Sequence, residues 1–110
     1  MPLAENQLRF LRGRAHPLKP VILIGQHGLS EAVVTETARA LADHELIKVK
    51  VRGAERDARD AMLAELARRT AAELVTRIGH VAVLYRRRDR EPRLPLPEPA
   101  AGTAAPTAQA

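Results

Sequence analysis

A short apolar run that ends in two spaced glycines is the feature that most restricts the fold of this chain. Residues 21–24 are all apolar, and the glycine-bracketed stretch at residues 25–28 follows directly. A continuous apolar run of this length suits a strand covered on both sides, so we expect it in the centre of a sheet. Ser30 then offers an N-cap for a helix, with Leu29 and Val34 at the positions of a hydrophobic staple. The sequence therefore predicts a strand, a glycine turn and a helix in close succession.

The remaining segments alternate between helical and strand periodicity. Apolar spacing predicts a first helix that ends near Pro17, a second that runs from Ser30 to about residue 44, and a third over about residues 55–70. Strands are expected over residues 46–51, 73–78 and 81–86, the last two joined by a type II′ turn at Gly79-His80. The order helix, strand, helix, strand, helix, strand, strand predicts a single α/β domain. We expect a mixed four-stranded sheet with helices packed on it.

Length and composition suit one folded domain followed by a tail. The chain has 110 residues, of which 45% are hydrophobic and 28% are charged. Five of the eight prolines follow residue 90 without apolar periodicity, so we expect a domain over residues 1–90 and a flexible tail over residues 91–110. The chain lacks cysteine and any apolar stretch long enough for a membrane helix. We therefore expect a cytoplasmic protein without disulfides or membrane contact.

Positive charge gathers near the two ends of the predicted domain. The 18 Lys and Arg residues exceed the 13 Asp and Glu residues by 5, which favours a polyanionic partner. No carboxylate occurs over residues 6–30, although this stretch contains Arg9, Arg12 and Lys19. Arg9, Arg12 and His16 share one helix face. A solvated helix face is the alternative interpretation, but the lack of acids favours contact with a ligand.

The types of residue present argue against an enzyme and against base stacking. Phe10 and Tyr85 are the only aromatic residues, so if the chain binds RNA, it does so mainly through backbone and shape. The four histidines are scattered, and no acid, base or nucleophile has convincing spacing. His44 and Glu45 stand at a helix-to-strand junction, where they more often tie down a turn than bind metal. We expect no catalysis, no metal, no cofactor and no small-molecule substrate.

The glycine pair itself allows two interpretations. Glycines let the backbone turn and approach a phosphate closely, and the following helix N-terminus attracts an anion. A purely structural turn is the alternative, because the pattern matches neither the Walker loop nor the dinucleotide fingerprint. The candidate loop residues are Gly25, Gln26, His27 and Gly28. His27 is a candidate donor to a phosphate, although an exposed loop histidine is often incidental.

Four separated sequence motifs, in the same order and with few gaps, resemble those of one protein family. They are Ala15-His16-Pro17-Leu18-Lys19-Pro20-Val21, Ile24-Gly25-x-x-Gly28-Leu29-Ser30, His44-Glu45-Leu46-Ile47-Lys48-Val49-Lys50 and Ile78-Gly79-x-x-x-Val83-Leu84-Tyr85-Arg86. They resemble the CRM domain, the chloroplast RNA splicing and ribosome maturation module, in its bacterial single-domain YhbY-like form. The resemblance spans roughly residues 8–88.

This resemblance implies a fold similar to the C-terminal domain of bacterial translation initiation factor three. It also implies association with RNA of precursor large ribosomal subunits, with the glycine loop likened to that of KH domains. In KH domains the loop joins two helices, whereas a strand precedes Gly25 here, so the analogy concerns backbone clamping. The variable loop positions carry no lysine, so we expect neighbours such as Lys19 and Arg12 to supply the charge.

For two further groups of cations, the sequence allows two alternative roles each. Lys48 and Lys50 match the family string, but alternating lysines also protect exposed strands from aggregation. Arg86, Arg87 and Arg88 either extend an RNA surface or solubilise the tail junction.

The leading hypothesis is a monomeric binding module for structured RNA, with ribosomal RNA of the maturing large subunit as the expected partner. The alternative is an adaptor that recognises ribosomal or assembly proteins mainly through the third helix, with RNA contact secondary. Charge reversal at Arg9, Arg12 and Lys19 separates them, because it should abolish co-sedimentation with the subunit only under the first hypothesis.

Overall fold

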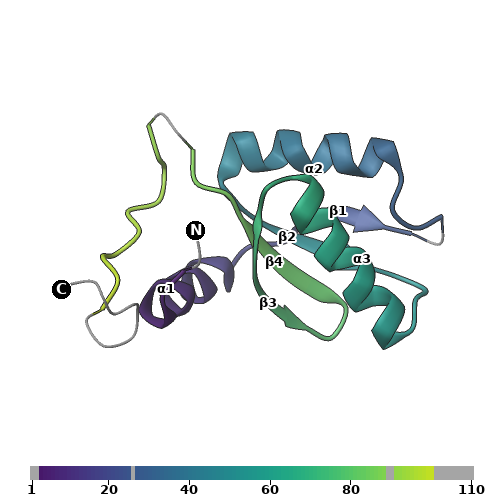
Figure 1. The fold of residues 1–110 in the computed structure, drawn as a ribbon, viewed down its shortest axis with the longest axis horizontal. Coiled ribbons are helices and arrows are strands. Elements are labelled where there is room, and N and C mark those ends of the chain that lie inside the picture. Colours follow the sequence, from purple (N-terminus) through teal and green to yellow (C-terminus); the bar gives the residue numbers. More distant parts are fainter. Residues whose placement is uncertain (1–2, 26, 89–90, 101–110) are drawn as a thin grey trace.

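The computed structural model describes residues 3–25, 27–88 and 91–100. Within these residues it contains three helices and four strands. In chain order they are α1 (Glu5–Ala15), β1 (Pro20–Ile24), α2 (Glu31–His44), β2 (Leu46–Val51), α3 (Arg56–Arg69), β3 (Glu73–Ile78) and β4 (Val81–Tyr85). Figure 1 shows this order, which is the one predicted from the sequence. The α/β class is therefore confirmed.

The strands form one mixed sheet in the order β1-β2-β4-β3. Strand β1 runs parallel to β2, and the other two pairs are antiparallel, as expected for the crossover and hairpin connections. The prediction that β1 is central was wrong, because it is an edge strand. Its Ile22 and Ile24 are buried, whereas Val21 and Leu23 are 54% and 52% exposed. The apolar run therefore has one covered face and one open face.

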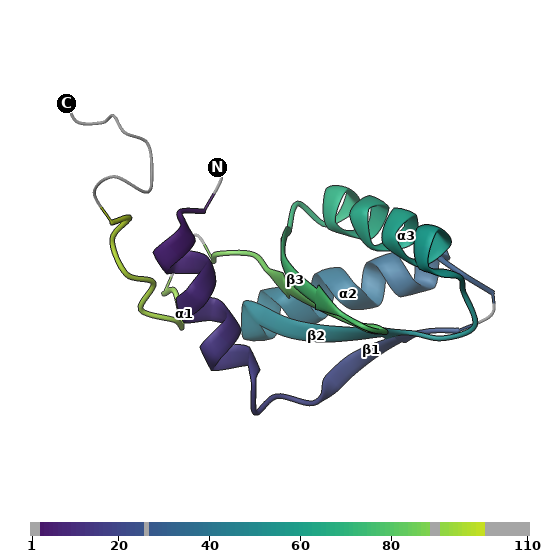
Figure 2. The ribbon, with the colours of Figure 1, turned by 90° about the horizontal axis from the view of Figure 1, so that it is seen from below.

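Helices cover the two faces of the sheet unequally. On one face, α2 and α3 enclose the larger core, in which Leu41, Leu63 and Leu66 meet buried residues of β1, β2 and β4. On the other face, α1 packs only against one end, where Leu11 and Ala15 meet a smaller cluster. Figure 2 shows α1 standing at one end of the sheet while α2 and α3 run along it. Half of the second face is left without a helix.

Local signals in the sequence explain the ends of the elements. The Ser30 hydroxyl accepts a hydrogen bond of 3.2 Å from the backbone N–H of Val33, which confirms the predicted N-cap of α2. Strands β3 and β4 pair through Ile78 and Val81, which leaves a two-residue loop. Gly79 in that loop has a φ of 60°, as the first position of a type II′ turn requires.

A buried carboxylate holds the chain that follows β4. Glu45 is fully buried with a φ of 65°, a region that non-glycine residues rarely occupy. Its two carboxylate oxygens accept hydrogen bonds from the backbone N–H groups of Arg88 (2.8 Å), Arg93 (2.5 Å) and Leu94 (2.9 Å). This agrees with the interpretation of Glu45 as a residue that ties down a turn. The three bonds connect the helix-to-strand junction to a segment more than 40 residues away.

Residues 91–100 continue from this carboxylate along α1. Leu94 and Leu96 pack on the smaller cluster, and the Gln7 side chain donates to the carbonyl oxygen of Pro97 at 2.8 Å. The sequence did not predict these contacts, because the tail has no apolar periodicity. An extended proline-rich segment can lie on a helix without such periodicity. Residues 101–110 lie outside the described residues, and the domain boundary at residue 90 stays a prediction.

Candidate nucleic-acid interface

A backbone hydrogen bond joins the two glycines of the loop. The Gly28 N–H donates to the carbonyl oxygen of Gly25 at 3.0 Å, and Gly28 has a φ of 73°, a conformation that favours glycine. Gly25 and His27 are exposed, and no atom lies within 4 Å of where a Cβ on Gly25 would stand. Gln26 lies outside the described residues. The turn leads into the N-terminus of α2, where free N–H groups and the helix dipole favour an anion.

Strand register determines which cations stand next to this loop. Ile24, the residue before the loop, pairs with Val51, and Leu23 pairs with Lys50. The backbone N–H of Arg52 donates to the carbonyl oxygen of Ile24 at 2.9 Å, and the Arg52 side chain is exposed. Lys50 and Arg52 are therefore the loop's neighbours on the adjacent strand. Sequence reasoning missed Arg52, although aligning the two apolar runs as parallel strands would have placed it beside Gly25.

The structure does not bring the arginines of α1 to the loop. Helix α1 packs through Leu11 and Ala15 on the cluster that contains Leu46, the first residue of β2, whereas the loop adjoins the last residue of β2. Figure 1 shows α1 and the β1–α2 connection at opposite ends of the molecule. The expectation that Arg12 and Lys19 supply charge to the loop was therefore wrong, since both precede the first residue of β1. The reason is that α1 joins β1 at its beginning, a full strand length from the glycines.

The side chains of α1 remain accessible in their own region. Arg9 is exposed, and Arg12 is partly exposed and forms an ion pair with Glu5 at 3.3 Å. Such exposed pairs contribute little to stability, so Arg12 stays available to a ligand.

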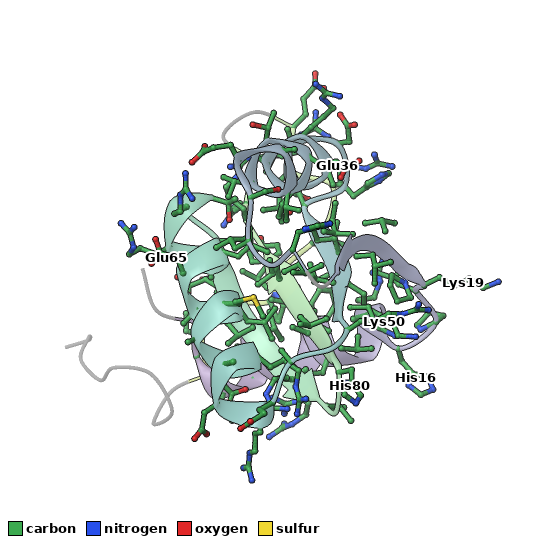
Figure 3. The ribbon with its side chains drawn as sticks, turned by 90° about the vertical axis from the view of Figure 1, so that its right-hand side faces the viewer. His16, Lys19, Glu36, Lys50, Glu65 and His80 are labelled. Atoms are coloured by element: carbon green, nitrogen blue, oxygen red, sulfur yellow. The ribbon has the colours of Figure 1, made fainter. Side chains whose placement is uncertain are left out.

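The connection between α1 and β1 lies between these two regions. The Lys48 ammonium donates to the carbonyl oxygens of His16 (3.2 Å) and Leu18 (2.9 Å), so it secures this connection to the sheet. His16 and Lys19 are exposed. In Figure 3, His16, Lys19 and Lys50 lie on the side of the sheet away from α3, while Glu65 lies on α3 and Glu36 on α2. His16, Lys19 and Lys50 thus lie on a different side from Glu36 and Glu65.

The three arginines after β4 have different surroundings. The Arg86 guanidinium donates to the carbonyl oxygens of Thr70 (2.8 Å) and Ala38 (3.2 Å), which joins the end of α3 to α2. Arg87 is exposed, whereas Arg88 is partly exposed and donates its backbone N–H to Glu45. All three follow Tyr85, which pairs with Leu46 at the α1 end of the sheet. They are therefore distant from the glycine loop along the strands.

The described part of the chain contains little that could perform acid–base or metal chemistry. No group of three or more His, Asp or Glu side chains in it could hold a metal ion. The Tyr85 hydroxyl is buried and has no hydrogen-bond partner among the residues that the structure describes. Burial and the nearby Glu45 carboxylate raise its pKa, and Arg87 opposes this shift. Among the described residues, none of the helices combines the length and apolarity needed to cross a membrane.

The fold and this surface define a class: a small α/β domain with an exposed glycine turn and a cationic sheet side. The family model of the CRS1 / YhbY (CRM) domain matches residues 3–86, so the chain belongs to the CRM domain family. An RNA-binding protein of Haemophilus influenzae is 48% identical over 84 residues, covering 76% of this chain and 85% of that protein. A protein of Pseudomonas aeruginosa named as a probable RNA-binding protein is 46% identical over 87 residues, covering 79% and 84%.

A solved structure shares the fold. The solution structure of a Staphylococcus aureus protein, described as a candidate RNA-binding protein, superposes with a TM-score of 0.76 at 33% identity. The match covers 87% of this chain and all of that protein. The family and the fold of this chain are thereby the ones that the four sequence strings indicated.

Proposed function

We propose that this chain is a non-enzymatic RNA-binding protein that associates with ribosomal RNA of the precursor large ribosomal subunit and assists its assembly. The names of its relatives support RNA as the partner. The observation that carries the proposal is the exposed turn from Gly25 to Gly28 beside Lys50 and Arg52. Open space at the Cβ position of Gly25, ahead of a helix N-terminus and next to cations, suits a sugar-phosphate chain.

The remaining cations extend this contact toward the α1 end of the molecule. Lys19 and His16 stand on the α1–β1 connection, and Arg9 and Arg12 lie on the helix beyond it. Arg87 and Arg88 add charge at the same end of the sheet as α1. An RNA that reaches both the glycine loop and α1 must have a defined shape, which supports a structured partner. Lys48 and Arg86 contribute indirectly, because their charged groups bind carbonyl oxygens within the fold.

Crosslinking in cells followed by mapping of the bound RNA tests the partner. Enrichment of precursor large-subunit RNA is the expected result. Crosslinks confined to messenger or transfer RNA would overturn the assembly role while leaving RNA binding intact.

Salt dependence tests the kind of contact. If about five phosphates are neutralised, raising salt from about 50 to 200 mM should weaken binding roughly a hundredfold. A flat response would contradict a phosphate-dominated interface. It would favour the alternative of a protein-binding adaptor.

A further inference from the structure

Four side chains form a continuous row across the sheet beside the glycine loop. Leu23 on β1 pairs with Lys50 on β2, Lys50 pairs with Val81 on β4, and Val81 pairs with Ile78 on β3. Paired residues on neighbouring strands point to the same face, so all four stand side by side. We call Leu23, Lys50, Val81 and Ile78 the aliphatic row. Its outer members are 52% and 76% exposed, for Leu23 and Ile78 respectively.

The aliphatic row belongs to the part of this face that the fold leaves open, together with exposed Val21. At the other end of the face, Leu46 and Tyr85 are buried under α1. Between the two ends, Lys48 binds the α1–β1 connection through two carbonyl oxygens. Because only Ile24 separates Leu23 from Gly25, the first residue of the glycine loop, the row and the loop are adjacent on the surface. Exposed apolar side chains gathered in this way generally mark a binding site.

We propose that the aliphatic row receives unpaired nucleosides of the RNA whose phosphates lie at the glycine loop. This inference rests on the proposed function and specifies the class of RNA. In a duplex the base faces are stacked inside the helix, so aliphatic side chains could touch only sugars and phosphates and would gain little. In a loop or bulge, the base faces and riboses are accessible to apolar side chains. The row can therefore contribute to affinity only where the RNA is unpaired.

Charge favours nucleic acid over an apolar protein as the occupant. Strands β1, β2 and β4 contain no carboxylate, and neither does the stretch from residue 6 to residue 30. Lys50 stands between Leu23 and Val81 in the middle of the row, so an apolar protein surface placed there would bury its ammonium without a counterion. A nucleotide strand covers the apolar side chains and supplies the counter-charge. The row thus replaces, with aliphatic groups, the aromatic platform that this sequence lacks.

The test compares the affinity of the full chain for a labelled single-stranded RNA and for a duplex of the same length. Leu23→Thr and Ile78→Thr reduce the exposed apolar surface, and threonine is a residue that strands favour. Leu74→Thr is the matched control, because Leu74 is also on β3 and 41% exposed but pairs with core residue Leu84 on the opposite face. We expect the double variant to bind single-stranded RNA about tenfold more weakly. Its duplex affinity should stay unchanged, and the control should match the parent chain.

Each outcome separates this inference from the proposed function. Equal binding of single strand and duplex, unaffected by the double variant, would overturn the inference and leave RNA binding standing. Loss of a co-purified assembly protein with unchanged RNA affinity would also overturn it and would assign the row to a protein. Failure of the parent chain to bind any RNA would overturn both. If Leu23→Thr impairs folding, as measured by circular dichroism, Ile78→Thr alone carries the test because that side chain is mostly in solvent.

Discussion

The Arg86 guanidinium donates a hydrogen bond of 2.8 Å to the carbonyl oxygen of Thr70, the residue that caps the end of α3. The same group donates to the carbonyl oxygen of Ala38 in α2 at 3.2 Å. One side chain at the end of the sheet therefore joins the two helices that cover the larger core. Arg87, its neighbour in the chain, is exposed instead.

We expect Arg86→Ala to lower the free energy of unfolding by about 2 kcal/mol, because hydrogen bonds to charged groups contribute about 1.5–3 kcal/mol. Arg87→Ala serves as the control and should change stability by less than about 0.5 kcal/mol. Urea unfolding of the two variants measures the difference. Equal effects would show that the contacts of Arg86 do not stabilise the fold.

Glu45→Gln should destabilise the protein and release the segment after β4. The amide would present an N–H group to backbone N–H groups of Arg88, Arg93 or Leu94, so at least one hydrogen bond is lost. We expect a loss of about 2–3 kcal/mol and faster amide hydrogen exchange at Leu94. Glu36→Gln on the exposed side of α2 is the control. Unchanged exchange at Leu94 in Glu45→Gln would contradict this role.

The two loop glycines should respond differently to alanine. Gly28 has a φ of 73°, so Gly28→Ala should cost about 1 kcal/mol of stability from the left-handed backbone conformation. Gly25 has open space at its Cβ position, so Gly25→Ala should leave the unfolding midpoint nearly unchanged.

A larger side chain at Gly25 tests the loop's function separately from its stability. Gly25→Val should fold normally but bind RNA more weakly, because the side chain keeps a phosphate away from the backbone. RNA affinity and thermal unfolding measured on the same sample distinguish the two effects. Full affinity in folded Gly25→Val would argue against close approach at this loop.

Tyr85 should lower the free energy of unfolding at alkaline pH. Burial, with a contribution from the Glu45 carboxylate, raises its pKa above the ordinary value of 10.0. The folded state then holds the proton more tightly than the unfolded state, so this contribution is present below pH 10 and is lost as the pH rises through the folded pKa. Tyr85→Phe should remove that loss, and it should not destabilise the protein near neutral pH because the hydroxyl has no partner. Urea unfolding of both proteins at pH 8 and pH 11 makes the comparison, and identical alkaline losses would contradict it.

The order of the elements could be predicted because each one is encoded locally. Ser30 begins α2 with its own side chain, and Gly79 sets the hairpin turn with its own backbone. The place of β1 in the sheet could not be predicted in the same way. Apolar residues on both faces do not show whether a second strand pairs on the other side of β1, and in the described residues β1 pairs with β2 alone.

The sequence predicted the types of residue at the candidate site better than their positions relative to one another. The glycine loop follows from the sequence, but the neighbouring cations depend on the pairing of β1 with β2, which brings Lys50 and Arg52 to it. Sequence alone likewise could not distinguish Lys48 from Lys50. Lys48 binds two carbonyl oxygens of the α1–β1 connection. Lys50 stands in the open aliphatic row, which that connection does not reach.

The most direct test of the central claim is RNA affinity after charge reversal on the open side of the sheet. Lys19→Glu combined with Lys50→Glu should weaken binding of large-subunit RNA by at least about tenfold, and the slope of log affinity against log salt should fall by roughly one for each lost phosphate contact. Arg39→Glu combined with Arg56→Glu makes the same charge change on exposed positions of α2 and α3, and it should leave that slope nearly unchanged. Equal losses in the two double variants would contradict a defined RNA surface at the glycine loop and the open sheet.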